Sequence, residues 1–125
     1  MEPIRVLLVE DNDVYRESLV FLLARYEGLE VAGAVATAGA APSACAELYV
    51  DVAVVDYRLP DLDGAEAAAA IQERRPETAI VFLSASAGDD EYAAARSTGA
   101  ELIRKDEGVD TLVDAVRAAA GRSTA

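Results

Sequence analysis

The chain has 125 residues, which is enough for one domain with a proper core and too few for two ordinary domains. It carries 11 basic and 23 acidic residues, a formal net charge of -12, and so acidic a surface repels nucleic-acid phosphates and anionic lipids. A single cysteine, Cys45, and the lack of histidine exclude an internal disulfide and a structural zinc site. No apolar run approaches the ~20 residues of a membrane span, and the N-terminus lacks a secretory signal. We therefore expect a cytoplasmic protein whose chain binds neither nucleic acid nor membrane.

The first part of the chain predicts two strand–helix pairs. Ile4–Val9 is an apolar run with one arginine, as expected for a parallel strand that is covered on both faces. A helix is expected at 14–26, because apolar residues recur there at spacings of four and three, and Gly28 can end it. A weaker strand at 30–36 and a helix at 40–49 follow.

Three further strand–helix pairs complete the pattern. Residues 52–55 predict a short β-branched strand that runs into Asp56. An alanine-rich helix begins at Gly64 and stops before Pro76. The remaining elements are a strand at 79–83, a helix from Asp89 closed by Gly99, a strand at Glu101–Arg104, and a last helix with Val109, Leu112, Val113 and Val116 on one face.

This alternation predicts the fold class and the domain organisation. Strands that alternate with helices of this length form a parallel sheet with right-handed crossovers. We predict a doubly wound α/β fold with five parallel strands, the flavodoxin-like order 2-1-3-4-5, and five helices. One domain is expected at residues 1–120, and residues 121–125 are expected to form a tail or the start of a linker.

Polar side chains follow four of the five predicted strands. Glu10 and Asp11 come after the first strand, Asp56 after the third, Ser84 after the fourth and Lys105 after the fifth. Because the carboxyl ends of parallel strands meet at one edge of the sheet, we expect these side chains to converge. Each residue taken alone has a simpler interpretation, since Asp11 could cap a helix, Ser84 could form a turn and Lys105 could be solvated.

Three converging carboxylates favour a bound cation. At ~4 Å and an effective dielectric constant of about 20, each pair of like charges costs about 4 kcal/mol. The ligands on offer are hard oxygens, which suit magnesium. An aspartate beside magnesium can attack a phosphorylated donor and form an acyl phosphate. Lys105 would then balance one phosphoryl oxygen, and Ser84 would donate a hydrogen bond to another.

Four short motifs occur in order along the chain. The segment from Asp56 to Gly64 reads Asp, two residues, Leu-Pro, two residues, Asp-Gly. The other motifs are Val9-Glu10-Asp11, Leu83-Ser84-Ala85 and Lys105. Together they resemble the receiver domain of bacterial two-component response regulators, with its chemotaxis-regulator-like fold, over nearly the whole chain.

The resemblance implies a role for each matching position. Asp56 would accept a phosphoryl group from the phosphohistidine of a sensor histidine kinase. The implied magnesium ligands are Asp11, Asp56 and the backbone carbonyl of Arg58, with Glu10 acting directly or through water. The implied phosphate-binding groups are Ser84, the Ala85 amide and Lys105. Arg58 and Ser86 stand two residues beyond Asp56 and Ser84, where we expect them to set the rate of autodephosphorylation.

One position departs from the family pattern. The segment from Gly99 to Lys105 is one residue shorter than the family often has, and Leu102 stands where an aromatic residue is usual. In the family this aromatic swings inward when the hydroxyl residue moves toward the phosphate, so we do not expect that form of the switch here. The surface of the fourth helix and fifth strand, extending toward the fifth helix, remains the leading candidate for phosphorylation-dependent dimerisation. It includes Tyr92, Ala93, Ala94 and Ala95, although alanine is also simply a good helix former.

The expected output is transcriptional control, and no enzymatic activity is expected beyond slow self-catalysed dephosphorylation. Three alternatives stay open: a stand-alone receiver, a receiver that only binds partners, and a phosphohydrolase of the haloacid dehalogenase type that uses Asp11. The last has Asp11-Asn12-Asp13 in its favour, but it leaves the segment from Asp56 to Gly64 unexplained.

Overall fold

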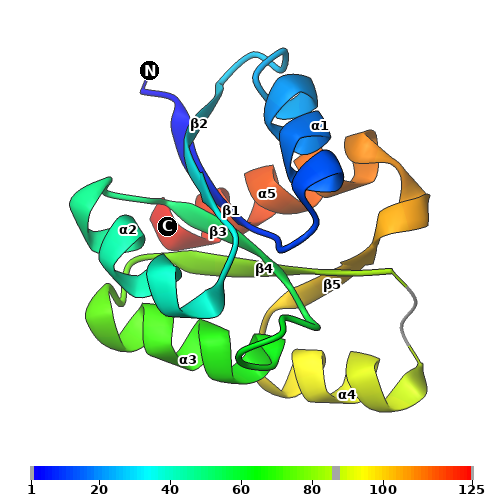
Figure 1. The fold of residues 1–125 in the computed structure, drawn as a ribbon. Coiled ribbons are helices and arrows are strands. Elements are labelled where there is room, and N and C mark those ends of the chain that lie inside the picture. Colours follow the sequence, from blue (N-terminus) through cyan, green and yellow to red (C-terminus); the bar gives the residue numbers. More distant parts are fainter. Residues whose placement is uncertain (1, 86–87, 125) are drawn as a thin grey trace.

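A central parallel sheet organises the computed structural model, which describes residues 2–85 and 88–124. The strand order is β2-β1-β3-β4-β5, as predicted, and helices cover both faces of the sheet (Figure 1). The strands are β1 (Ile4–Val9), β2 (Leu29–Val35), β3 (Val52–Asp56), β4 (Ala79–Ser84) and β5 (Glu101–Arg104).

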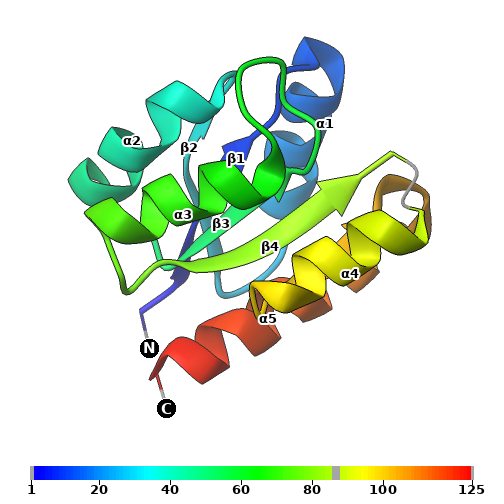
Figure 2. The same ribbon diagram turned by 90° about the horizontal axis from the view of Figure 1, so that it is seen from below.

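The helices divide between the two faces. They are α1 (Asp13–Leu23), α2 (Ala41–Glu47), α3 (Gly64–Arg74), α4 (Asp89–Ser97) and α5 (Val109–Thr124), with short 3-10 turns η1 (Ala38–Ala40) and η2 (Lys105–Glu107). One core lies between the sheet and α1 with α5, and the other between the sheet and α2, α3 and α4. Figure 2 shows α2, α3 and α4 along one side of the sheet. None of the helices in the described ranges is long and apolar enough to cross a membrane.

The central strand explains why the strand sequences are so apolar. All five residues of β3 are buried. Val52 and Val54 point into the core under α1 and α5, whereas Ala53 and Val55 point into the other core. A strand with a helical layer on each face has no solvent side, so its pattern is a continuous apolar run rather than an alternation.

Several helix ends differ from the prediction. The helix expected at 14–26 begins at Asp13 and ends at Leu23, and the Tyr26 hydroxyl instead donates a hydrogen bond to Asp110 of α5. The helix expected at 40–49 spans only Ala41–Glu47, after η1. At the other end of the chain, α5 continues to Thr124, so residues 121–124, expected as a tail, are helical. The domain boundary at residue 120 stays a prediction.

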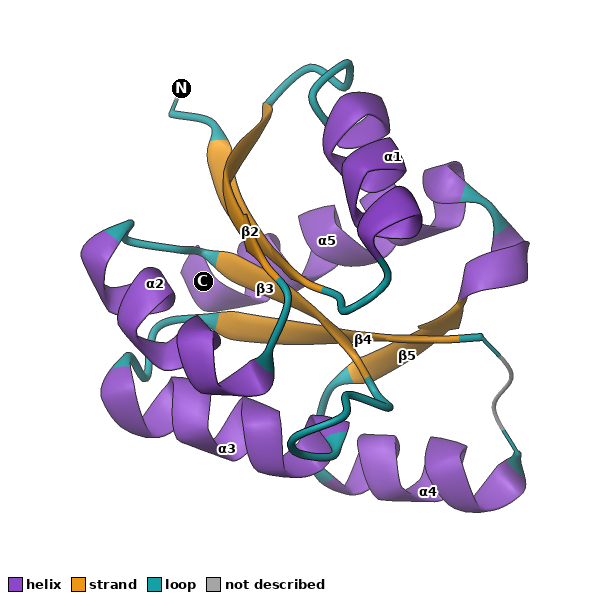
Figure 3. Ribbon diagram, in the orientation of Figure 1, coloured by secondary structure: helices purple, strands orange, loops and turns teal. Residues whose placement is uncertain are grey.

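The register of the strands aligns their carboxyl ends. Val9 pairs with Val55, and Asp56 pairs with Leu83. The strands are parallel, so the loops that follow β1, β3, β4 and β5 all leave from the same edge of the sheet (Figure 3). Side chains at the beginning of these loops are therefore held near one another by the backbone hydrogen bonds of the sheet.

Candidate functional site

Three carboxylates lie together at this edge. Glu10 and Asp11 follow β1, and Asp56 is the last residue of β3; one carboxylate oxygen of each lies within 4.8 Å of the others. Glu10 is 1% exposed and Asp56 is 6% exposed, whereas Asp11 faces solvent. The convergence predicted from the strand order is present, and it places two acidic side chains largely out of water.

Lys105 supplies the compensating charge. It is the first residue of η2, directly after β5. Its Nζ lies 2.6 Å from Oε1 of Glu10 and 3.1 Å from Oδ2 of Asp56. One ammonium against three carboxylates leaves a formal charge of -2 at the site, which a divalent cation would neutralise.

The surroundings shift the ionisation of the buried pair. Burial raises the pKa of Glu10 above its ordinary value, and hydrogen bonds from Lys105 and from the Asn12 amide only partly oppose this. Burial acts to lower the pKa of Lys105, but Glu10 and Asp56 outweigh it and raise that pKa above its ordinary value. Lys105 therefore remains an ammonium at neutral pH.

The beginning of α1 fixes Glu10 in place. The Asn12 amide donates to Oε2 of Glu10 over 3.0 Å, and the Arg16 guanidinium donates to the backbone carbonyl of Glu10 over 2.8 Å. Arg16 also pairs with Asp13 at 2.6 Å. These roles of Asn12 and Arg16 were not predicted from the sequence. Asparagine just before an apolar helix is a recognised N-cap signal, and Asn12 does cap α1 by accepting from the Tyr15 amide.

The motif after β3 is a compact loop that holds the Asp56 carboxylate. The Arg58 amide donates to Oδ1 of Asp56 over 2.9 Å, and the Tyr57 amide donates to the Leu83 carbonyl over 2.7 Å. The loop closes where the Gly64 amide donates to the Tyr57 carbonyl over 2.8 Å. A Cβ on Gly64 would lie 2.7 Å from Cδ2 and 2.8 Å from Cα of Tyr57, so only glycine fits this position.

Two further aspartates of the motif have structural roles. Asp61 accepts from the amides of Ala38 and Gly39, at 3.1 and 3.0 Å, and so ties the loop to the beginning of η1. The Gly39 amide, followed by the Ala38 amide, lowers the pKa of Asp61 below its ordinary value. Asp63 caps α3 by accepting from the Glu66 amide at 2.8 Å. These contacts anchor the loop to η1 at Asp61 and to the beginning of α3 at Asp63.

The residues expected to bind phosphate lie beside Asp56. Ser84 ends β4, one residue beyond Leu83, the strand partner of Asp56, and it is 1% exposed. Ala85 follows and faces solvent. Ser86 lies outside the described residues.

The region of α4 and β5 that was expected to act as the switch differs in one respect from the prediction. Leu102 is buried in β5 beside Phe82 of β4, within the core under α2, α3 and α4. Ala95 was expected on the exposed surface of α4, but it is 1% exposed and belongs to the same core. That assignment was wrong, because the helix turns this alanine toward the sheet. Ala93 and Ala94 do face solvent.

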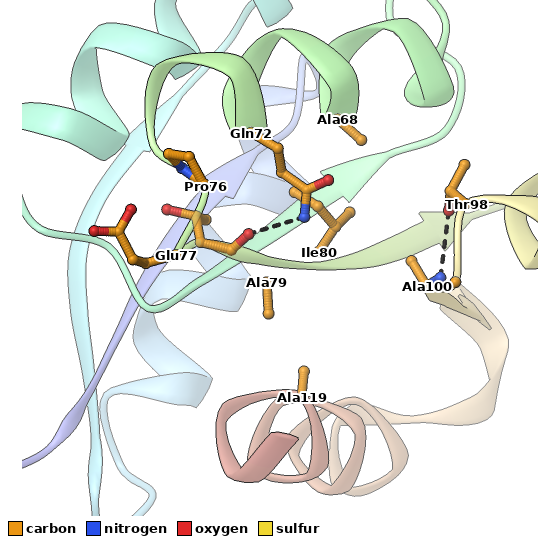
Figure 4. A pocket seen from close by; sticks show the side chains of 11 residues that line it. Ala68, Gln72, Pro76, Glu77, Ala79, Ile80, Thr98, Ala100 and Ala119 are labelled. Atoms are coloured by element: carbon orange, nitrogen blue, oxygen red, sulfur yellow. Dashed lines mark hydrogen bonds between the residues drawn. The ribbon is translucent and has the colours of Figure 1, made fainter. Parts of the chain in front are cut away.

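A cavity of about 350 Å³ lies at the opposite edge of the sheet, around the beginning of β4 (Figure 4). Among its described lining residues, Glu77 alone is ionisable. Two hydrogen bonds join residues that line the cavity to one another. Gln72 donates to the Thr78 carbonyl over 3.1 Å, and the Ala100 amide donates to the Thr98 hydroxyl over 3.3 Å. Three carboxylates and an ammonium converge at the acidic edge, whereas Glu77 stands alone among the described residues that line this cavity, so the acidic edge is the candidate site.

Comparison with known proteins agrees with the geometry. The family model described as "Response regulator receiver domain" matches residues 6–117. The response regulator protein VraR of Staphylococcus epidermidis is 31% identical over 115 residues, which cover 91% of this chain and 55% of VraR. A protein-glutamate methylesterase/protein-glutamine glutaminase of Anaeromyxobacter dehalogenans is 37% identical over 104 residues, 82% of this chain and 30% of that protein.

Solved structures show the same likeness. The response regulator domain of CheB from Thermotoga maritima has a TM-score of 0.85 and 26% identity, with 96% of this chain and 98% of that chain covered. A LuxR-family two-component response regulator from Aurantimonas has a TM-score of 0.88 and 28% identity, with 96% and 86% covered. This chain belongs to the response regulator receiver domain family, and it spans between about a third and about a half of the length of these two curated relatives.

Proposed function

We propose that Asp56 accepts a phosphoryl group from the phosphohistidine of a sensor histidine kinase in the cytoplasm. The observation that carries the proposal is the position of the Asp56 carboxylate at the sheet edge. Its Oδ1 accepts from the Arg58 amide, its Oδ2 accepts from Lys105, and Glu10 and Asp11 lie next to it. The chain would thus act as a signalling phosphoacceptor, and no other enzymatic activity is proposed for it.

The arrangement supports the following transfer. A carboxylate oxygen of Asp56 forms a bond to phosphorus, and the bond from phosphorus to the imidazole nitrogen breaks. The electron pair stays on the imidazole, and the product is an acyl phosphate on Asp56. Lys105 already contacts Asp56, so its ammonium is placed to balance a phosphoryl oxygen. The Ser84 hydroxyl and the Ala85 amide are proposed to donate to the other phosphoryl oxygens.

The donor set fits magnesium. Carboxylate oxygens of Glu10, Asp11 and Asp56 lie within 4.8 Å of one another, and all are hard ligands of the kind that magnesium prefers. With the Arg58 carbonyl, which belongs to the loop that follows Asp56, they would hold the ion, and Glu10 could act directly or through water. When bound, the ion would neutralise the negative charges of the carboxylates and of the phosphoryl group.

Two further proposals concern the loss of the phosphoryl group and the output of the domain. Arg58 and Ser86 are proposed to set the autodephosphorylation rate by shielding or orienting the attacking water. We also propose that the output is transcription, through a conformational change or dimerisation at the surface of α4, β5 and α5. The support is similarity to the probable transcriptional regulatory protein NarL of Mycobacterium tuberculosis, which is 32% identical over 92% of this chain and extends beyond the matched part. Leu102 replaces the usual aromatic, so the switch would not use an aromatic swing at this position.

Intact mass tests the phosphoacceptor proposal. The wild type, Asp56→Asn and the matched surface control Asp114→Asn are incubated with magnesium and acetyl phosphate. We expect one added phosphoryl group on the wild type and on Asp114→Asn, none on Asp56→Asn, and none on any variant when the magnesium is chelated. A gain that persists in Asp56→Asn would contradict the proposal and direct attention to Asp11.

A further inference from the structure

An aromatic ring contacts the lysine of the site. The Nζ of Lys105 lies 4.4 Å from the centroid of the Tyr15 ring, which is cation–π distance. Tyr15 is in the first turn of α1 and is half-buried. The proposed function assigns it no role, and in the sequence it is simply one member of the apolar face of a helix.

The contact closes a ring of interactions around the site. Oε2 of Glu10 accepts from the Asn12 amide, and Oδ1 of Asn12 accepts from the Tyr15 amide. The Tyr15 ring contacts the Lys105 ammonium, and that ammonium forms an ion pair with Oε1 of Glu10 at 2.6 Å. The backbone of Tyr15 is thus anchored to the same segment that carries two of the site carboxylates. The site itself therefore places the backbone from which the ring extends to Lys105.

We infer that Tyr15 is a positioning residue, which holds the Lys105 ammonium at the place where it meets the phosphoryl group on Asp56. This inference rests on the proposed phosphorylation of Asp56. A cation and a phosphoryl group would bind to the carboxylates of Glu10 and Asp56. The ion pairs between these carboxylates and Lys105 therefore change during the reaction. The ring carries no charge and takes no part in the transfer, so its cation–π contact with Lys105 persists throughout.

The space around the lysine gives such a constraint a role. A cavity of about 130 Å³ lies between α1, β5 and α5, and both Tyr15 and Lys105 border it. A smaller side chain at position 15 would enlarge this cavity and leave the long lysine stem more positions to occupy. Loss of the ring therefore reduces the fraction of molecules in which the ammonium is correctly placed.

The test compares Tyr15→Phe, which keeps the ring, with Tyr15→Leu, which removes it. Phosphorylation rates are measured by intact mass with magnesium and acetyl phosphate. A cation–π contact at a partly buried site corresponds to a rate factor of about three to ten, so we expect Tyr15→Leu to be slower by that factor and Tyr15→Phe to stay within about twofold of wild type.

A double-mutant cycle with Lys105→Met separates positioning from general packing. If Tyr15 acts through the lysine, Tyr15→Leu lowers the residual rate of Lys105→Met by less than about twofold. An equal fall in both backgrounds, or equal rates for Tyr15→Leu and wild type, would overturn the inference. A rate for Tyr15→Phe as low as that for Tyr15→Leu would overturn it as well.

Proton NMR gives a readout that does not depend on phosphorylation. The Lys105 methylene protons next to the ammonium should be shifted upfield by the ring in the wild type and in Tyr15→Phe, and this shift should vanish in Tyr15→Leu. Unshifted protons in the wild type would refute the contact. If the wild type takes up no phosphoryl group, the proposed function is refuted. If the wild type is phosphorylated at a rate no higher than that of Tyr15→Leu, only the positioning role is refuted.

Discussion

Replacing Gly64 with alanine tests the account of the loop that holds Asp56. The added Cβ would lie 2.8 Å from Cα of Tyr57, about 0.6 Å inside the 3.4 Å at which ordinary contact begins. That atom belongs to the backbone and cannot rotate away, so the loop or the first turn of α3 must move. Overpacking of this kind costs about 1–3 kcal/mol. The higher helix propensity of alanine offsets up to about 1 kcal/mol.

We therefore expect Gly64→Ala to lower the free energy of unfolding by about 1.5 kcal/mol, the middle of the range left after the helix-propensity gain is subtracted. The assay is urea denaturation followed by circular dichroism. Gly121→Ala in α5 is the matched control, because its added Cβ would meet no atom within 4 Å. This control should be stabilised by up to about 1 kcal/mol. If Gly64→Ala were as stable as the control, the steric explanation of the motif glycine would be wrong.

Three other outcomes follow from the contacts described. Thr78 is fully buried and its hydroxyl donates to the Val50 carbonyl over 2.9 Å, so Thr78→Val should cost about 1 kcal/mol in urea denaturation; an unchanged midpoint would count against that bond. Burial raises the pKa of the Cys45 thiol to about 11, so a thiol reagent at pH 8 should label it only after unfolding, and rapid labelling of the native protein would contradict this. The pKa of Asp61 is lowered by two backbone amides, so the stability that it adds is present above pH ~4 and lost as the pH falls further. The difference in stability between the wild type and Asp61→Ala should shrink below that pH, and a difference that grew would show that the sign is wrong.

The strand order and the convergence of the acidic residues could be predicted from the sequence. Continuous apolar runs such as Ile4–Val9 identify strands that are buried on both faces, and parallel topology brings their carboxyl ends to one edge. Once Glu10, Asp11 and Asp56 are known to follow strands, their proximity requires no knowledge of side-chain positions. This is why the acidic cluster was predictable.

Helix ends and individual side-chain contacts could not be predicted in the same way. Apolar periodicity indicates which residues are buried, not where a helix ends. Tyr26 continues the apolar spacing of α1, although it lies in a turn and packs toward α5. A run of alanines does not reveal which one faces the sheet, and so Ala95 was misplaced. The Tyr15 contact with Lys105 joins α1 to η2, and its distance depends on how these two elements pack.

The position of the phosphoryl group tests the central claim most directly. Wild-type protein phosphorylated by acetyl phosphate is reduced with borohydride, which converts an aspartyl phosphate to homoserine, and the peptides are sequenced by mass spectrometry. We predict homoserine at position 56 and at no other position. Homoserine at position 11 with Asp56 unmodified would contradict the assignment of Asp56 as the phosphoacceptor.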